Sequence, residues 1–242
     1  MTFDMKAYIE NLKINECNQC EEIQQLQSLN NKDIKVAPLF WQGEGKLNIP
    51  LIIMGINPAI VGTTDEPLRE CDFEHYYDYY QNRHESEKKN IREARDGGFL
   101  RRIPTNYWTR CHNLAKCLVG NHVKRWKEYV LMEAIHCFYN KASDLSAEQS
   151  IRVAEKCFDR HTKNLLITLK PKMIVFFGKS PYKLLDRYMN ETLADYEYSL
   201  LNLDNFSVPV LRHPHPASFS SGAFYRPEIY ESFISFCEKE NR

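Results

Sequence analysis

Residues 49–56 read IPLIIMGI and predict a short buried β-strand. The run is apolar and rich in β-branched residues, and its length and its proline boundaries favour a strand over a buried helix segment. Three further runs of this kind follow along the chain: EYVLMEAIHC (128–137), PKMIVFFG (171–178) and VPVLRHP (208–214). Residues 192–206 are ambiguous, with a hairpin as one interpretation. The sequence therefore predicts four short strands at the centre of the fold.

Helical patterns stand between and beside these strands. We expect helices at 4–30, 108–118, 146–170 and 226–240, with a further helix after Gly178. Ser146, with Gln149 three residues later, has the pattern of a capping box. Strands that alternate with helices form parallel sheets covered on both faces. The predicted fold is α/β, a single three-layer α/β/α domain over residues 1–242 with a central, mainly parallel four-stranded sheet. A polar and aromatic segment is inserted in it at about 60–104.

The composition is typical of a globular protein. The chain has 242 residues, of which 43% are hydrophobic and 26% charged, and 32 Lys and Arg balance 32 Asp and Glu. These values exclude wholesale disorder, collagen-like repeats and histone-like binding of nucleic acid by bulk charge. No apolar run approaches the roughly 18 residues of a membrane-spanning helix, and MTFDMKAYIE does not resemble a secretory signal. We therefore expect a cytoplasmic, monomeric protein with no membrane partner.

The even charge balance contains two segments of opposite sign. Residues 65–78, DEPLRECDFEHYYD, are acidic, whereas residues 83–110 contain eight Lys and Arg against four Asp and Glu. A small basic segment is sufficient to contact a few phosphate groups in a protein with no net charge. Net neutrality therefore does not exclude DNA as a partner.

Two motifs follow the first and the fourth predicted strand. They read GINPA (55–59) and HPHPAS (213–218). In open α/β sheets the ligand lies outside the carboxyl ends of the strands, where both motifs are expected. Glycine permits close backbone approach, and the prolines stiffen the loops. Either motif alone also has a structural interpretation, because Asn-Pro often ends a strand and a single histidine is usually structural.

Eight cysteines stand at positions 17, 20, 71, 111, 117, 137, 157 and 237. In a reducing compartment, closely spaced cysteines such as Cys17 and Cys20 more often indicate metal or redox chemistry than disulfides. The alternative is that each cysteine is a small buried apolar residue.

The motifs, taken in order, resemble those of the uracil-DNA glycosylase superfamily. GINPA is similar to the first motif of the mismatch-specific uracil/thymine glycosylases, Gly-Ile-Asn-Pro-Gly, and HPHPAS is similar to the second motif of the superfamily, His-Pro-Ser-Pro. Phe99 and PTNYW (104–108) resemble the Phe and the Pro-x-Asn-x-Phe-Trp of the mismatch-specific branch, with about one extra residue between them. The resemblance implies a monofunctional DNA glycosylase, which hydrolyses the N-glycosidic bond of an extruded base, uracil or another modified or deaminated pyrimidine, and leaves an abasic site.

The cysteines resemble those of a second branch, the iron–sulfur uracil-DNA glycosylases. Cys17 and Cys20 match its N-terminal Cys-x2-Cys, and Cys137 and Cys157 match its second pair with a gap a few residues longer. The resemblance implies a structural [4Fe–4S] cluster that connects the N-terminal helix to the 138–156 loop. Four thiolates also suit tetrahedral zinc, the less favoured occupant. The other four cysteines are expected to be core or surface thiols.

The resemblance also implies roles for the matched residues. Asn57 positions the attacking water, and His213 donates a hydrogen bond to the base O2, where negative charge develops. Phe99 stacks on the base. The other substrate-binding candidates are Gly55, Ile56, Pro58, Ala59, Glu133, Asn140 and Ser218. The DNA-binding candidates are Arg101, Arg102, Lys179, Ser180, His215 and Phe219.

Glu133 departs from the pattern, because the iron–sulfur branch has an asparagine there that reads the uracil edge. An ionised carboxylate only accepts hydrogen bonds, so Glu133 suits an amino group, as on cytosine or its derivatives, better than uracil O4. Alternatively Glu133 is protonated, Asn140 reads the base, or Glu133 makes a hydrogen bond that has nothing to do with the base. Two other functions stay open: a non-catalytic iron–sulfur nucleic-acid-binding protein of the same fold, and a zinc-containing hydrolase of another substrate.

Overall fold

Four parallel strands form the centre of the fold, in the order β3, β2, β4, β6. They are β2 (Leu51–Gly55), β3 (Tyr129–Glu133), β4 (Ile174–Phe177) and β6 (Phe206–His213). All four coincide with predicted strands. The computed structural model describes residues 4, 7–8, 11, 20–22, 41–43, 45–55, 105–125, 127–136, 145–178, 185–189, 197–216 and 226–240.

Two antiparallel strands extend the sheet at its edges. β1 (Trp41–Gln42) pairs with β3, and β5 (Tyr198–Leu203) forms a hairpin with β6. The turn of this hairpin places Asp204 at φ 49°, a conformation that Asp tolerates better than most residues. In the described part of the chain the sheet therefore has six strands, not the four that were predicted. β1 was missed because two residues carry no periodicity. The hairpin suggested for 192–206 extends further than expected: Tyr198–Leu203 is its first strand, and its second strand is β6, the predicted fourth strand.

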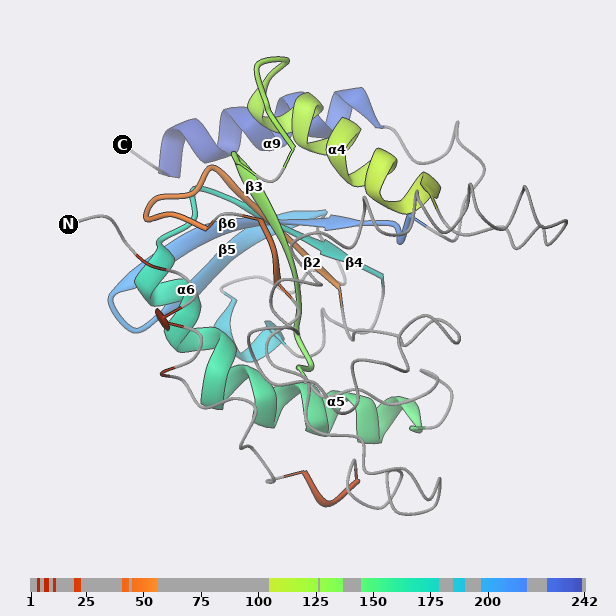
Figure 1. Ribbon diagram of the computed structural model, residues 1–242, viewed down its shortest axis with the longest axis vertical. Helices are drawn as coiled ribbons and strands as arrows, with labels where there is room; N and C mark the ends of the chain where they lie inside the picture. Colours follow the sequence, from red (N-terminus) through yellow and green to blue (C-terminus); the bar gives the residue numbers. More distant parts are fainter. Residues whose placement is uncertain are drawn as a thin grey trace, which may run out of the picture.

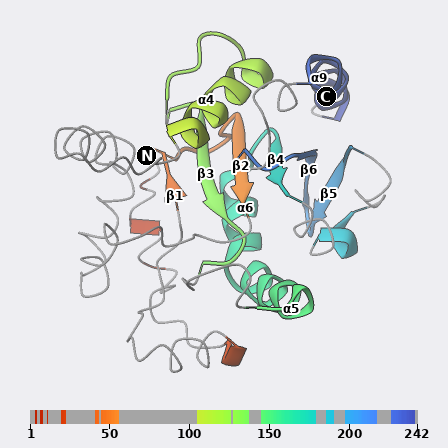
Figure 2. The same ribbon diagram turned by 90° about the vertical axis from the view of Figure 1, so that its right-hand side faces the viewer.

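Helices cover both faces of this sheet, as Figures 1 and 2 show. α4 (Thr105–Val119) and α9 (Pro227–Glu240) lie on one face, where they bury the side chains of Leu51, Ile53 and Val175. α5 (Ala147–Cys157) and α6 (Lys163–Leu169) cover the opposite face. Because both faces are covered, β2, β3 and β4 are buried along their full length, and β6 is buried from Val208 to Leu211 and at His213. The predicted α/β/α layering is confirmed.

A π-helix interrupts the helix that was predicted to be continuous over 146–170. Ser146 and Gln149 form the predicted capping box, with main-chain to side-chain hydrogen bonds of 2.9 and 3.1 Å. α5 then runs into a π-helix at Phe158–Thr162 before α6 begins, and Lys170 ends α6 at φ 47°. Single π-helical turns inside α-helices occur frequently at functional sites.

The N-terminal region is described only at a few positions. Residues 7–8, 11 and 21–22 are helical, in agreement with the helix predicted over 4–30, most of which lies outside the described residues. Tyr8 contacts α6 through a hydrogen bond of 2.9 Å to the hydroxyl of Thr168. Among the described helices, none has the length and apolar character that a membrane span requires.

Candidate functional site

The strand order places a topological switch point between β2 and β4. From β2 the chain continues to β3 on one side, and it then crosses to β4 and β6 on the other side. In sheets of this order, with the first and third parallel strands adjacent, ligands bind in the crevice at the carboxyl ends of those two strands. The expected crevice therefore lies over Gly55, the last residue of β2, and Phe177, the last residue of β4.

Four residues form one transverse row across this carboxyl edge. Glu133 of β3 pairs with Gly55 of β2, and Phe177 of β4 pairs with His213 of β6. Met54 of β2 pairs with Phe176 of β4, so the next residues, Gly55 and Phe177, are also level. Alternate residues of these strands, including Leu131, Ile53, Val175 and Leu211, belong to the core under α4 and α9. Since side chains alternate between faces, Glu133, Phe177 and His213 also face α4 and α9. With a strand spacing of about 4.8 Å, the row spans about 14 Å from Glu133 to His213.

The carboxylate of Glu133 packs directly on the backbone of Gly55. A Cβ added to Gly55 would lie 2.1 Å from Oε2 of Glu133 and 2.8 Å from Oε1, so only glycine leaves space for this carboxylate. Glu133 is 6% exposed, and the Ala134 main-chain N–H donates to the Gly55 carbonyl at 3.0 Å. Gly55, the described residue of the first motif, is thus in contact with Glu133.

His213 is held inside the protein by both of its ring nitrogens. Nδ1 lies 2.9 Å from the Pro214 carbonyl oxygen, which can only accept, so we assign the ring proton to Nδ1. Nε2 then accepts from the Tyr230 hydroxyl of α9 at 2.7 Å. The imidazole also stacks on the Tyr230 ring and meets the edge of Phe177. His213 is 1% exposed, so a hydrogen bond to a base would have to replace one of these internal bonds.

The loop after His213 is anchored to α4 and to β4. Arg110 of α4 donates a hydrogen bond to the Pro216 carbonyl oxygen. The ring of His215 packs edge-on against Phe177 with centroids 6.0 Å apart, and burial lowers the pKa of His215. Phe177 therefore contacts both histidines of the second motif, a role that the sequence did not indicate because Phe177 reads only as a core residue of its strand.

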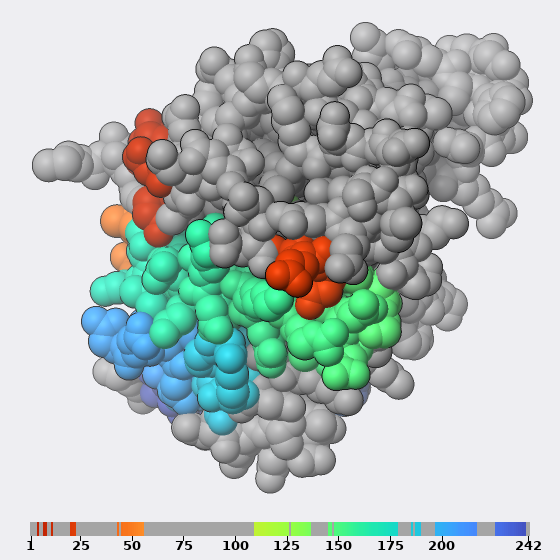
Figure 3. Space-filling view, turned by 90° about the horizontal axis from the view of Figure 1, so that it is seen from below, coloured from red at the N-terminus to blue at the C-terminus, as the bar shows by residue number. Residues whose placement is uncertain are grey.

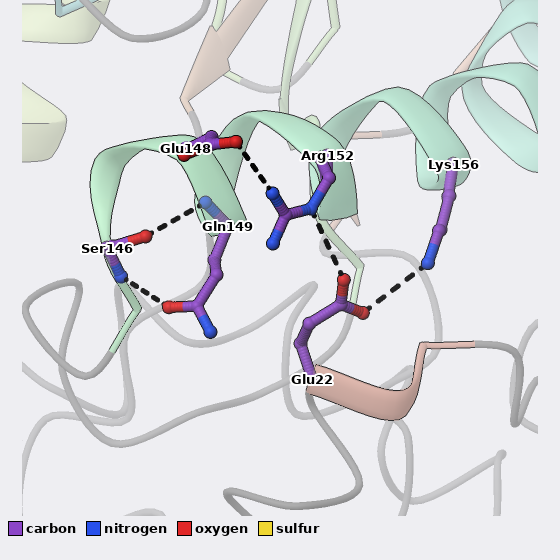
Figure 4. A network of polar contacts seen from close by, with 6 residues as sticks. All are labelled: Glu22, Ser146, Glu148, Gln149, Arg152 and Lys156. Carbon is purple, nitrogen blue, oxygen red and sulfur yellow. Dashed lines mark hydrogen bonds and ion pairs between the residues drawn. The ribbon is translucent and has the colours of Figure 1, made fainter.

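Two of the four predicted metal ligands, Cys20 and Cys157, are buried on the opposite face of the sheet. The segment 20–22 lies against α5, as Figure 3 shows. Glu22 bridges two basic residues of α5, with Oε1 3.7 Å from Arg152 Nε and Oε2 3.5 Å from Lys156 Nζ (Figure 4). Lys156 directly precedes Cys157, so the segment that carries Cys20 is attached beside the end of α5 that carries Cys157. The segment predicted as a 138–156 loop is helical from Ala147 onward.

Two buried histidines accompany Cys157. The main-chain N–H of His136 donates to Cys157 Sγ at 3.3 Å, and His136 Nε2 lies 2.9 Å from Thr162 Oγ1. The rings of His136 and His161 meet edge to face, 6.0 Å between centroids. Among the described residues, His136 Nδ1 and His161 Nε2 are buried nitrogens that make no hydrogen bond. Burial, then proximity to His161, lowers the pKa of His136 well below its usual range.

These surroundings suit a metal held by thiolates. Cys20 and Cys157 supply two soft donors, and the main-chain N–H of His136 donates to the Cys157 sulfur. The rings of His136 and His161 each have one buried nitrogen that makes no hydrogen bond among the described residues. Cys17 stands three residues before Cys20, and Cys137 directly follows His136. In the described part of the chain no three candidate ligands come together, so a complete site requires Cys17 and Cys137. Cys111 and Cys237 are core residues, and Cys117 is exposed, in agreement with the roles expected for them.

The other predicted site residues lie outside the described residues. Of the substrate-binding and catalytic candidates these are Ile56, Asn57, Pro58, Ala59, Phe99, Asn140 and Ser218. Of the DNA-binding candidates they are Arg101, Arg102, Lys179, Ser180 and Phe219. Cys17, Cys71 and Cys137 also belong to this group.

The buried histidines predict a fall in stability in mild acid. Burial, followed by the charge of Arg160, lowers the pKa of His161 from 6.5 to about 4. Between these values the unfolded chain binds a proton that the folded chain excludes, so the free energy of unfolding should fall as the pH drops from 6.5 toward 4. The free energy of unfolding of His161→Gln, measured with urea, should fall less between pH 7 and pH 5 than that of the natural chain. His122→Gln, at an exposed histidine, is the control and should not show this smaller fall. Identical pH profiles for all three proteins would contradict this assignment.

No protein-family model matches this chain, and no curated protein matches it significantly.

Proposed function

We propose that this protein is a DNA glycosylase that hydrolyses the N-glycosidic bond of an extruded base and leaves an abasic site. The observation that carries the proposal is the row Glu133, Gly55, Phe177, His213 at the carboxyl edge of the parallel strands. Residues from both glycosylase-like motifs, Gly55 and His213, stand in this row on either side of Phe177. The row also crosses the switch point, where a sheet of this order binds its ligand.

The chemistry requires few groups at this edge. Asn57, two residues beyond Gly55, positions the attacking water, and Phe99 stacks on the extruded base. His213 supplies the hydrogen bond to the base O2 from its Nδ1–H once the base replaces the Pro214 carbonyl as the acceptor. A donor that meets charge developing in the transition state contributes more to the rate than one that binds the substrate alone. His215, with Arg101, Arg102, Lys179, Ser180 and Phe219, contacts the DNA around the base.

Glu133 favours a base that carries an exocyclic amino group. Its carboxylate lies on Gly55 in the same row and is almost fully buried, which supports a role for Glu133 in reading the base edge. As an acceptor it matches the amino group of a modified cytosine, whereas ionised Glu133 opposes the O4 acceptor of uracil. We therefore expect modified cytosines to be better substrates than uracil.

A [4Fe–4S] cluster held by Cys17, Cys20, Cys137 and Cys157 would join the N-terminal segment to the end of α5. When bound, the cluster supplies a structural cross-link through its thiolate ligands and takes no part in the hydrolysis. Zinc on the same four thiolates would supply the same cross-link. A brown colour with absorbance near 400 nm would distinguish the cluster from zinc.

The experiment that tests the function is base release from a panel of oligonucleotides. The panel holds uracil, thymine mismatches, hypoxanthine and modified cytosines, in single and double strands, and alkaline cleavage reports each abasic site. We expect release of at least one base, and we expect Asn57→Ala to lower it by about 100-fold, since positioning the nucleophile is worth at least this much. Asn164→Ala, at an exposed asparagine of α6, is the matched control and should retain full activity.

One observation favours a second candidate, a non-catalytic nucleic-acid-binding protein of the same fold. Both ring nitrogens of His213 are engaged by protein groups, which a purely structural histidine would also show. Binding of the panel oligonucleotides without release of any base would support this candidate and contradict the glycosylase. Unchanged release by Asn57→Ala would contradict the role of Asn57 alone.

A further inference from the structure

The π-helix at Phe158–Thr162 places Cys157 and Thr162 on the same side of their helix. In a regular α-helix two residues five apart point about 140° away from each other. The π-helical hydrogen bond from the Lys163 N–H to the Phe158 carbonyl spans five residues and removes most of this difference. A single neighbouring residue can therefore contact the side chains of both Cys157 and Thr162.

His136 is that neighbour. Its main-chain N–H donates to Cys157 Sγ at 3.3 Å, and its ring Nε2 lies 2.9 Å from Thr162 Oγ1. His136 is completely buried, and it immediately precedes Cys137 in the chain. One residue thus connects Cys157, Thr162 and the position of the third predicted ligand.

The remaining ring nitrogen of His136 has a hydrogen-bonding capacity that the described residues do not use. His136 Nδ1 is buried and makes no hydrogen bond there, although an unsatisfied buried polar atom costs about 1–3 kcal/mol. The Thr162 hydroxyl can donate to Nε2, which would place the ring proton on Nδ1. The main chain of His136 already contacts the Cys157 sulfur, and metal-bound sulfurs accept hydrogen bonds, so a metal-bound thiolate is an acceptor that a buried Nδ1–H could use.

We propose that His136 is a positioning residue of the metal site, whose Nδ1–H donates a hydrogen bond to a metal-bound cysteine sulfur and whose tautomer is set by the Thr162 hydroxyl. This inference rests on the metal site in the proposed function, not on base excision. Such outer-shell donors orient the ligands, and their loss typically weakens metal binding by about 10- to 100-fold. His161 packs edge-on against His136 and keeps its ring in place.

The test measures the rate at which the metal-loaded protein, purified without oxygen, loses its metal to a chelator. The amide of Asn reaches the position of Nδ1, and that of Gln reaches the position of Nε2. We expect His136→Gln to release metal at least about tenfold faster than the natural chain, and His136→Asn to stay within about threefold of it. Thr162→Val, which removes only the hydroxyl, should also release metal faster, and Thr162→Ser should restore the slow rate.

Thr109→Val is the control, because Thr109 is an exposed threonine of α4, which covers the opposite face of the sheet. Far-UV circular dichroism identifies any variant that does not fold. Equal release rates for His136→Gln, His136→Asn and the natural chain would overturn the proposal. A folded natural chain that binds neither iron nor zinc would overturn it together with the metal site, whereas base release, measured separately, decides the glycosylase.

Discussion

Replacing Gly55 with alanine is expected to lower base release by about 100-fold, because a displacement of about 1 Å at a reacting site can have this effect. The new Cβ would lie 2.1 Å from Oε2 of Glu133 in the present geometry, so the carboxylate has to move. Glu133 is almost fully buried, so its carboxylate has little space to move. Overpacking of this kind typically lowers the free energy of unfolding by about 1–3 kcal/mol. Initial rates on the best substrate of the panel, with urea unfolding in parallel, measure both effects.

A double mutant separates the steric cause from other effects of the substitution. Glu133→Ala removes the atoms with which the new Cβ collides. The loss of unfolding free energy caused by Gly55→Ala should therefore be smaller in the Glu133→Ala background than in the natural chain. Equal losses in the two backgrounds would show that Glu133 does not restrict residue 55. The stability cycle does not depend on catalysis, so it remains informative for a protein without glycosylase activity.

Replacing Phe177 with alanine is expected to lower the free energy of unfolding by about 3–5 kcal/mol, the usual cost of removing a buried phenylalanine. Phe177 is 1% exposed, and its ring contacts the rings of His213 and His215. Its removal should admit water to His215, so the pKa of His215, which burial now lowers, should rise toward its ordinary value. NMR titration of the histidines measures this change, and denaturant unfolding measures stability.

Phe176→Ala is the matched control for this prediction. Phe176 is equally buried and adjacent in the chain, but it faces the core beneath α5 and α6 on the other side of the sheet. Both variants should lose similar stability, and only Phe177→Ala should change the titration of His215. A similar change in His215 in both variants would mean that general loosening, not the contact with Phe177, determines that pKa.

The sequence predicted those features that carry their own local signal. The four central strands are apolar runs with clear ends, and the capping box at Ser146 is visible from two residues three apart. The convergence of Gly55, Glu133 and His213 at one edge followed from the general rule for parallel sheets. Their common row did not, because the register depends on pairing between strands that are far apart in the sequence.

The features that the sequence did not predict depend on tertiary contacts. The π-helix interrupts a stretch whose apolar spacing is that of an ordinary helix, so no local signal marked it. The hydrogen bond of His213 to Tyr230, seventeen residues later in the chain, has no signal in the sequence. His136 and His161 were not singled out, although the position of His136 directly before Cys137 was a signal that could have drawn attention to it.

The attachment of the N-terminal segment to α5 and α6 has a consequence for folding during synthesis. Glu22 contacts Lys156, 134 residues later, and Tyr8 contacts Thr168, 160 residues later. These contacts cannot form until most of the chain has left the ribosome, whereas β2, α4 and β3 can associate earlier. The two ion pairs of Glu22 are partly exposed and contribute little on their own. The nascent chain therefore emerges with Cys20 and Glu22 not yet attached to α5, and this attachment follows the synthesis of α5.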